Sequence, residues 1–150
     1  MAKPAATVVV LENKFKGAHL SGDALVRAAM AGGQTVETFA KINAERKFSA
    51  KATQTLAGSI QTTLDKADGN SAYVNVGPTV VYGRIHELGG IIKPVIAKTL
   101  HWINDAGEHV FAKLVKIPAR PYLRPAVDEH MNEISEAMNI TIKNEIESRL

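Results

Sequence analysis

The chain has 150 residues, of which 18 are Lys or Arg and 15 are Asp or Glu, so its formal net charge is +3. This length is typical of one domain that can bury a hydrophobic core, and 45% hydrophobic with 22% charged residues is ordinary for a globular protein. The lack of cysteine excludes disulfides, thiolate nucleophiles and metal sites built on cysteine, and it fits synthesis in a cytoplasm.

The N-terminal region predicts a strand followed by a long helix. Residues 5–11 form a short apolar, β-branched run, which favours a strand and is far below the roughly 20 residues of a membrane span, so no membrane role is expected. Ser21 is a suitable N-cap, and apolar residues at helical spacing predict a helix over residues 25–46. Gly32 and Gly33 interrupt that helix and indicate either a kink or a close approach of another segment.

The middle of the chain predicts a short helix and a first β-hairpin. Residues 50–57 suit a second helix, after which the apolar period changes from helical to alternating. Apolar residues alternate with polar ones over residues 60–64 and again over 72–76. Asp68-Gly69 lies between these two stretches and is a strong hairpin signal.

The next region predicts a helical turn and a second strand pair. Residues 82–88 suit a short helix that Gly89 and Gly90 would end. A loop or extended arm is expected over residues 91–99. Residues 100–103 and 110–117 are then predicted to pair as strands across a turn.

The C-terminal region predicts an extended connector and one long helix. Pro118, Pro121 and Pro125 keep the connector extended, and Pro125 suits the first turn of the helix. Glu145 and Arg149 are spaced to form an exposed ion pair. Five apolar residues mark one face of this helix: Val127, Met131, Ile134, Met138 and Ile142.

These elements predict an α+β fold in one domain over residues 1–150. An antiparallel sheet of two hairpins plus the N-terminal strand would carry a long N-terminal and a long C-terminal helix packed on it. No internal repeat or linker divides the chain.

The sequence offers no clear catalytic or metal site. It contains neither a glycine-rich phosphate loop nor a G-x-S-x-G elbow, and His86-Glu87 is followed by Gly90 where a zincin helix has its second histidine. His101 and His109 would face each other only in one register, and half-exposed strand residues are the simpler interpretation. No enzyme activity, cofactor or metal is therefore expected, although a fold can assemble a carboxylate pair that spacing does not reveal.

Basic and aromatic residues give a weak signal for nucleic acid. Dense basic clusters occur over residues 41–51 and 113–124, and the first is interpreted as a solvated surface. Trp102 and Phe111 are interpreted as core or sheet-face residues, because the aromatic share is only 5% and a stacking platform for single strands needs more.

Two motifs carry a family resemblance. The first is YGRIHELGGIIKP at residues 82–94, and the second is IPARPYLRPA at residues 117–126. Together they resemble the phage virion morphogenesis family typified by the Mu-like tail completion proteins, and a related lambdoid tail-component family with "YA-x-x-x-E-x-G" followed by "RPF-[LI]-RPA". The resemblance covers residues 53–130 well. The family has the pattern G-x-L-x-x-S-I before the first hairpin. This chain has Leu56, Ser59 and Ile60 at the matching positions, but Gln54 in place of the glycine.

The resemblance implies a non-enzymatic structural protein of the virion, made in the host cytoplasm and located at the head–tail junction or in the tail. Tail completion or head–tail joining is the implied role, and some related proteins are known only as minor tail components. The expected partners are further copies in a ring and other neck and tail proteins of the phage. The alternative from a different class is a basic protein that contacts packaged DNA in the portal or neck channel.

The same two motifs supply the candidate interface residues. Three prolines stiffen the second motif, which lowers the entropy cost of docking, and Arg and Tyr are favoured at interface hot spots. The alternative is an ordered connector with Tyr122 and Leu123 in the core. A cation at the start of a helix is disfavoured by the dipole, so Arg124 is expected to have an acidic partner, either a neighbouring subunit or an internal carboxylate such as Glu87. The candidates are Arg84, His86, Glu87, Arg120, Tyr122, Leu123 and Arg124.

Overall fold

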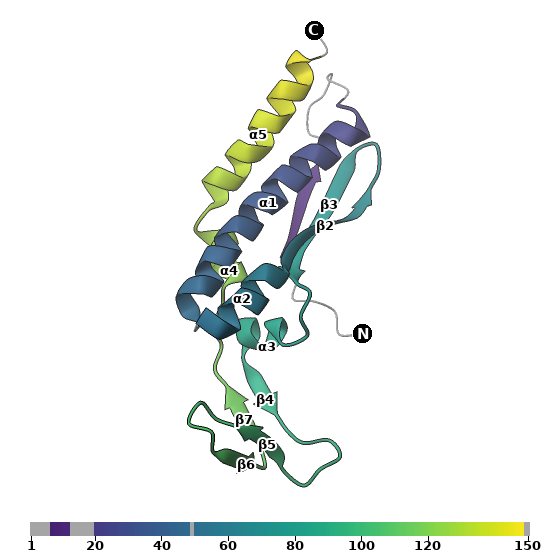
Figure 1. Cartoon of the computed structure of the whole chain (residues 1–150). Coiled ribbons are helices and arrows are strands. Elements are labelled where there is room, and N and C mark those ends of the chain that lie inside the picture. The colour runs from purple at the N-terminus through teal and green to yellow at the C-terminus, as the bar shows by residue number, and fades with distance from the viewer. Residues whose placement is uncertain (1–6, 13–19, 49, 149–150) are drawn as a thin grey trace.

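Helix α1 (Gly22–Lys47) runs along the body of the molecule, between a three-stranded sheet and the C-terminal helix α5 (Met131–Glu147) (Figure 1). The structure is a computed structural model that describes residues 7–12, 20–48 and 50–148. The α+β class predicted from the sequence is confirmed, with small antiparallel sheets and long helices near both ends of the chain.

The ends of α1 follow the sequence signals. The Ser21 side chain accepts a hydrogen bond from the Ala24 N–H at 3.3 Å, which confirms it as the N-cap. Asp23 lies in the first turn, and Arg46 and Lys47 lie in the last, so both charge types complement the helix dipole.

Gly32 and Gly33 allow two neighbours to approach α1 on different sides. A Cβ atom on Gly32 would lie 2.9 Å from the Met138 side chain of α5, and one on Gly33 would lie 2.5 Å from Thr62 Cγ2 in the sheet. The helix is continuous through both residues. Of the two predicted roles, close approach is therefore the one observed, and it places the sheet and α5 directly against the backbone of α1.

We expect Gly33→Ala to destabilise the protein by about 1–3 kcal/mol, the usual cost of overpacking. Thr62 is short and is held in place, because its N–H and hydroxyl both donate to Glu37 Oε2 at 2.8 Å. Gly32→Ala is the matched control. Met138 is flexible, and alanine gains about 1 kcal/mol of helix propensity, so this change should be nearly neutral. Urea unfolding of both variants tests this, and equal losses would contradict it.

The three-stranded sheet has the order β1-β3-β2 and is antiparallel throughout. Its strands are β1 (Thr7–Glu12), β2 (Ile60–Ala67) and β3 (Ser71–Pro78), and α2 (Ala50–Ser59) leads directly into β2. The predicted first hairpin is confirmed, and its turn is closed by Asp68, whose carboxylate accepts the Asn70 and Ser71 N–H groups at 2.8 Å. Leu64 departs from the predicted alternation and is 48% exposed, because the register shifts immediately after it.

The second predicted hairpin is present but does not join this sheet. Strand β5 (Leu100–Ile103) pairs with β6 (His109–Ala112), while β4 (Gly90–Ile92) pairs with β7 (Val115–Ile117). The predicted strand over 110–117 is therefore two strands with different partners, and the predicted loop over 91–99 begins inside β4. Alternating apolar residues indicate a strand but not its partner, which explains both errors. We call residues 90–117 the distal arm, which projects from the body in Figure 1.

The C-terminal region forms two helices where one was predicted. Helix α4 (Leu123–Asp128) has Glu129 as its C-cap, and α5 has His130 as its N-cap. The His130 ring stacks on Phe39 of α1 with centroids 3.4 Å apart. Met131 consequently starts a new helix and is 54% exposed, whereas Ile134, Met138 and Ile142 are buried as predicted. Pro125 lies in the first turn of α4 as predicted.

The predicted pair of Glu145 with Arg149 lies outside the described residues, because Arg149 is not among them. Glu145 instead forms a salt bridge with Arg27 of α1. That contact joins α5 to α1, and α5 packs mainly on α1.

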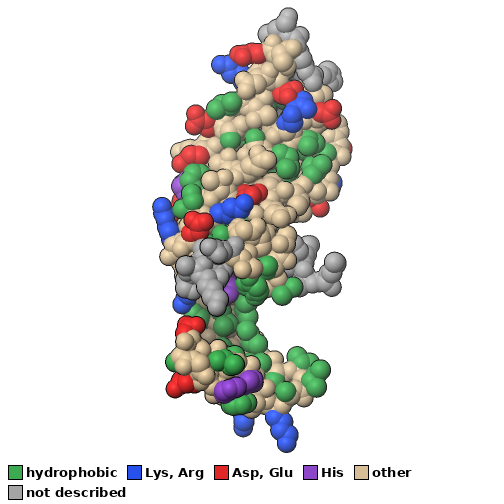
Figure 2. Space-filling view, in the orientation of Figure 1, with side chains coloured by type: hydrophobic (Ala, Val, Ile, Leu, Met, Phe, Trp, Pro, Cys, Tyr) green, Lys and Arg blue, Asp and Glu red, His purple; other side chains and the backbone are tan. Residues whose placement is uncertain are grey.

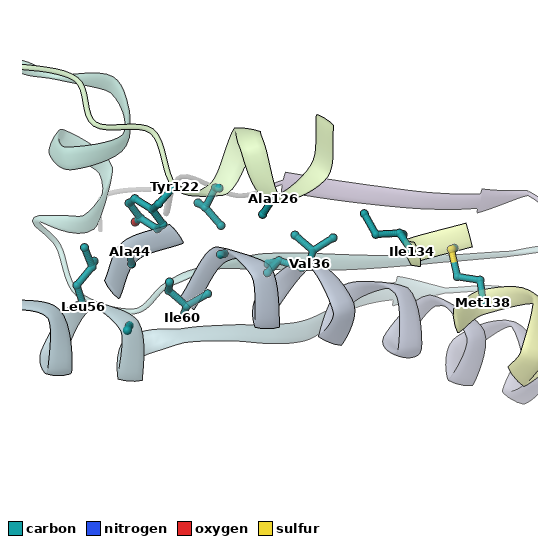
Figure 3. Close-up of a cluster of buried hydrophobic side chains, with 12 residues drawn as sticks. Val36, Ala44, Leu56, Ile60, Tyr122, Ala126, Ile134 and Met138 are labelled. Atoms are coloured by element: carbon teal, nitrogen blue, oxygen red, sulfur yellow. The ribbon is translucent and has the colours of Figure 1, made fainter. Parts of the chain in front are cut away.

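Among the described residues, the larger of two buried apolar clusters lies where the C-terminal half of α1 meets α2, α4 and the end of the sheet (Figure 3). Its largest fully buried side chains are Tyr122, Leu56, Ile60, Val36 and Val76. Tyr122 comes from the second sequence motif, so the motif is anchored in the core.

Candidate functional site

The two motifs singled out in the sequence meet at one buried carboxylate. Glu87 lies in α3 (Gly83–Leu88), which carries the first motif, and it is 8% exposed. Its Oε2 accepts the backbone N–H groups of Tyr122 at 2.7 Å and Leu123 at 2.9 Å, and its Oε1 accepts that of Arg124 at 3.0 Å. These donors open α4, where a helix leaves N–H groups without internal partners. Glu87 therefore caps α4 from a distant part of the chain.

Tyr122 provides the second link between the motifs. Its ring is fully buried, and its hydroxyl donates to the carbonyl oxygen of Gly83 at 3.1 Å. Burial, reinforced by the negative charge of Glu87, raises the pKa of Tyr122 well above its ordinary value, so the phenol remains a donor. Gly83 is required here because a Cβ atom would lie 2.3 Å from Pro78 Cγ.

Gly89 provides the third link. It ends α3 with φ of 71°, and a Cβ atom on it would lie 2.8 Å from the Ala119 backbone nitrogen. Next to it, the Arg120 N–H donates to the His86 carbonyl at 2.8 Å. We call these contacts of Gly83, His86, Glu87 and Gly89 with residues 119–124 the motif clamp. The clamp fixes both ends of the distal arm, because β4 starts immediately after Gly89 and β7 ends at Ile117.

The seven candidate interface residues fall into two groups. Glu87, Tyr122 and Leu123 are buried within the chain, so the alternative placing Tyr122 and Leu123 in the core describes them correctly. His86 is half-buried, and the three arginines, Arg84, Arg120 and Arg124, are exposed. Of the seven candidates, the three arginines and the exposed edge of His86 are therefore the groups that can contact another molecule directly.

Arg124 does not use Glu87 as an ion-pair partner. Glu87 Oε1 accepts the backbone N–H of Arg124, and Oε2 accepts the backbone N–H groups of Tyr122 and Leu123. Within the described parts of the chain, the Arg124 guanidinium forms no salt bridge. An acidic partner on a neighbouring molecule remains the prediction for this residue.

His86 lies among aromatic rings at the edge of the clamp. Its ring contacts Phe48 edge-on at 4.8 Å and Tyr82 at 5.9 Å, and the Arg120 guanidinium lies 6.0 Å from the Phe48 ring. Burial and, to a smaller extent, the charge of Arg120 lower the pKa of His86 below its ordinary value. The imidazole is therefore neutral at pH 7.

We expect this lowered pKa to make stability depend on pH. Below the ordinary histidine pKa, near 6.5, the unfolded chain binds a proton at His86 while the folded chain does not until lower pH. Stability is therefore lost as pH falls through that window. His86→Gln should flatten the decline of the melting temperature between about pH 7 and 5, as measured by calorimetry. His109→Gln on the exposed arm is the control, and parallel curves for the wild type and His86→Gln would contradict the assignment.

The distal arm is the feature that the sequence did not identify as a site. None of residues 88–121, all of which the structure describes, is buried, and the arm exposes many large apolar side chains. Trp102 and Phe111 were predicted to lie either in the core or on a sheet face. They lie on the sheet faces of the arm and are 39% and 63% exposed. The arm carries four exposed lysines, Lys93, Lys98, Lys113 and Lys116. Figure 2 shows basic side chains at its outer end.

His101 and His109 meet on one face of the arm. His101 Nε2 lies 2.8 Å from His109 Nδ1, and the His101 ring also stacks on Phe111 with centroids 4.7 Å apart. The two histidines are diagonal neighbours, because His101 pairs with Phe111 and His109 with Ile103. Among the described residues no group of three or more His, Asp or Glu side chains could hold a metal ion.

None of the helices that the structure describes has the length and apolar character needed to cross a bilayer.

Comparison with known proteins identifies one family. The model of the phage virion morphogenesis family matches residues 27–150, a range that contains both motifs and begins within α1. The match thus extends beyond the residues 53–130 over which the resemblance was recognised. Searches of curated proteins and of solved structures gave no match. By its match over most of its length, the chain belongs to the phage virion morphogenesis family.

Proposed function

We propose that the protein is a structural component of a tailed-phage virion that acts in tail completion or head–tail joining, as a ring of copies in the neck. Membership of the family supports a role in virion morphogenesis with other phage proteins as partners. The observation that carries the finer proposal is the distal arm, which exposes apolar residues on both faces and has no buried residue of its own. Contiguous exposed apolar surface of this kind marks a protein–protein contact.

A non-enzymatic role is part of the proposal. The one carboxylate of the two motifs, Glu87, is buried and accepts three backbone N–H groups, so it supports a structural role. We expect nuclease and peptidoglycan hydrolase assays to detect no turnover. An activity that disappears in His86→Ala would overturn this part of the proposal.

The direct test is a phage that lacks the gene for this chain. We expect its lysate to contain filled heads and separate tails, with few infectious particles, and complementation to restore joined virions. Electron micrographs of normal joined virions in the deletion lysate would contradict the proposal. Mass spectrometry of purified complemented particles should also detect this chain.

Contact with packaged DNA is the second candidate function, supported by the four exposed lysines of the distal arm. A protein that neutralises several phosphates binds DNA with affinity that falls steeply as salt rises. Titration of labelled duplex DNA at two salt concentrations tests this. Binding that is steep in salt and lost in a Lys93→Glu/Lys98→Glu variant would favour DNA contact over joining.

Arg124 provides a point test of the assembly role. We expect Arg124→Glu to change stability by less than about 0.5 kcal/mol, as is usual for an exposed side chain without an ion pair. Particle joining should nevertheless fall at least about tenfold, because like charges at an interface cost several kcal/mol. Arg124→Gln is the milder control. Thermal unfolding and plaque counts on the same variants measure both effects, and normal plaque counts for Arg124→Glu would show that this arginine is only solvated.

A further inference from the structure

The distal arm is rich in large apolar side chains that the chain itself does not bury. Its β5–β6 pair carries Trp102 and Val110 on one face and His101, Ile103 and Phe111 on the other. The side chains of Val95 and Ile96 are 96% and 100% exposed, Phe111 is 63% exposed and Ile103 is 59% exposed. A two-stranded ribbon needs a packed face for stability, so we infer that another molecule covers the arm.

The charge of the arm indicates the kind of surface that covers it. Lys93, Lys98, Lys113 and Lys116 are exposed, and none forms a salt bridge with any residue that the structure describes. The acids of the arm lie at the hairpin turn, where the Asn104 side-chain amide donates to Glu108 at 2.9 Å. The partner surface should therefore be acidic with an apolar centre.

The outer face of α5 has this character. Glu133, Glu136, Ile140 and Glu147 follow one another at helical spacing on the side away from buried Ile134, Met138 and Ile142. Lys143 lies on the same side and pairs with Glu147 at 3.7 Å, so the side remains net negative. Ile140 is 51% exposed at the centre of this face, and Glu136 forms no salt bridge within the described chain. We call these four residues the α5 outer face.

We propose that the distal arm of one copy docks on the α5 outer face of the next copy. The inference rests on the proposed function and names the contact that builds the ring. The arm projects from one end of the body, whereas α5 runs along its side at the other end (Figure 1). Two different surfaces of one subunit make a heterologous contact, which closes into a ring when the rotation allows.

The absence of cysteine from the chain allows a clean cross-linking test. The double variant Ile96→Cys/Ile140→Cys joins the arm of one copy to α5 of the next. Oxidation of particles that carry it should give a ladder of covalent multimers, because each copy bonds to two neighbours. Ile96→Cys alone and Ile140→Cys alone should give none. The matched control is Ile96→Cys/Asp65→Cys, which places the second thiol on exposed β2 and should also give no ladder.

A charge exchange tests the electrostatic part of the contact. Lys93→Glu/Lys98→Glu and Glu133→Lys/Glu136→Lys, each added to the cysteine pair, should reduce the ladder at least about tenfold, since like charges then face each other. Combining both exchanges should restore it. A contact held by some other surface would leave the ladder unchanged by each exchange, and that result would overturn the proposal.

The outcomes separate this inference from the proposed function. Dimers from Ile96→Cys alone would show arm-to-arm pairing, and a covalent bond to a different phage protein would show a different occupant; either overturns the proposal. Particles that contain the chain but give no ladder overturn the docking and leave the joining role intact. A chain missing from particles, with a normal deletion lysate, overturns the proposed function itself.

Discussion

Replacement of Glu87 with Ala should lower the free energy of unfolding by about 3–5 kcal/mol, the range expected when buried polar groups lose their partner. Three N–H groups at the start of α4, those of Tyr122, Leu123 and Arg124, would lose their acceptor. Glu87 is 8% exposed, so water cannot readily replace the carboxylate. A loss of this size is a large fraction of the 5–15 kcal/mol that typically stabilises a folded domain.

Glu87→Gln keeps the shape of the side chain but leaves one accepting oxygen and adds a donor where donors already converge. We expect a smaller loss, about 2 kcal/mol, which can be measured even if the alanine variant does not fold. Glu136→Gln on the exposed surface is the matched control and should change stability by less than about 0.5 kcal/mol. Chemical unfolding of the three variants gives the comparison. A wild-type midpoint for Glu87→Gln would show that the carboxylate is dispensable as a cap.

Replacement of Tyr122 with Ala should cost about 3–5 kcal/mol, as is usual when a fully buried aromatic ring is deleted. The ring belongs to the larger core cluster, where it packs with residues of α1, α2 and α4 (Figure 3). Its removal would leave a cavity next to the clamp. We expect the distal arm to become less protected from proteolysis in this variant, because residues 119–124 hold one end of the arm.

Tyr122→Phe separates the hydroxyl from the ring. It removes only the hydrogen bond to the Gly83 carbonyl, and we expect a loss of about 1–2 kcal/mol. Thermal and urea unfolding of both variants measure the two contributions. If Tyr122→Phe and Tyr122→Ala lost equal stability, the packing of the ring would contribute nothing and the interpretation of the cluster would be wrong.

The clamp gives the two motifs a shared physical role. Gly83, Glu87 and Gly89 all face the segment that contains Tyr122, and each is restricted by a hydrogen bond or by close contact. The segment between the motifs is the distal arm. The motifs thus hold the exposed arm in a fixed direction on the body, and a fixed direction is what a ring of identical subunits requires.

The sequence by itself determined several local features of this protein. The Ser21 cap, the Asp68-Gly69 turn and the end of α3 at Gly89 each depend on neighbouring residues, and each was predicted at its observed place. The two motifs also identified the family, because their order and spacing are readable without a fold.

Only the tertiary structure decided which strands pair and which polar groups meet. The pairing of β4 with β7 and the capping of α4 by Glu87 both join segments far apart in the chain, and no local pattern encodes such contacts. At the break before α5, His130 likewise stacks on a residue far away in the chain, Phe39 of α1. The same limit hid the distal arm, since alternating apolar residues predict a strand whether a core or a neighbouring molecule covers it.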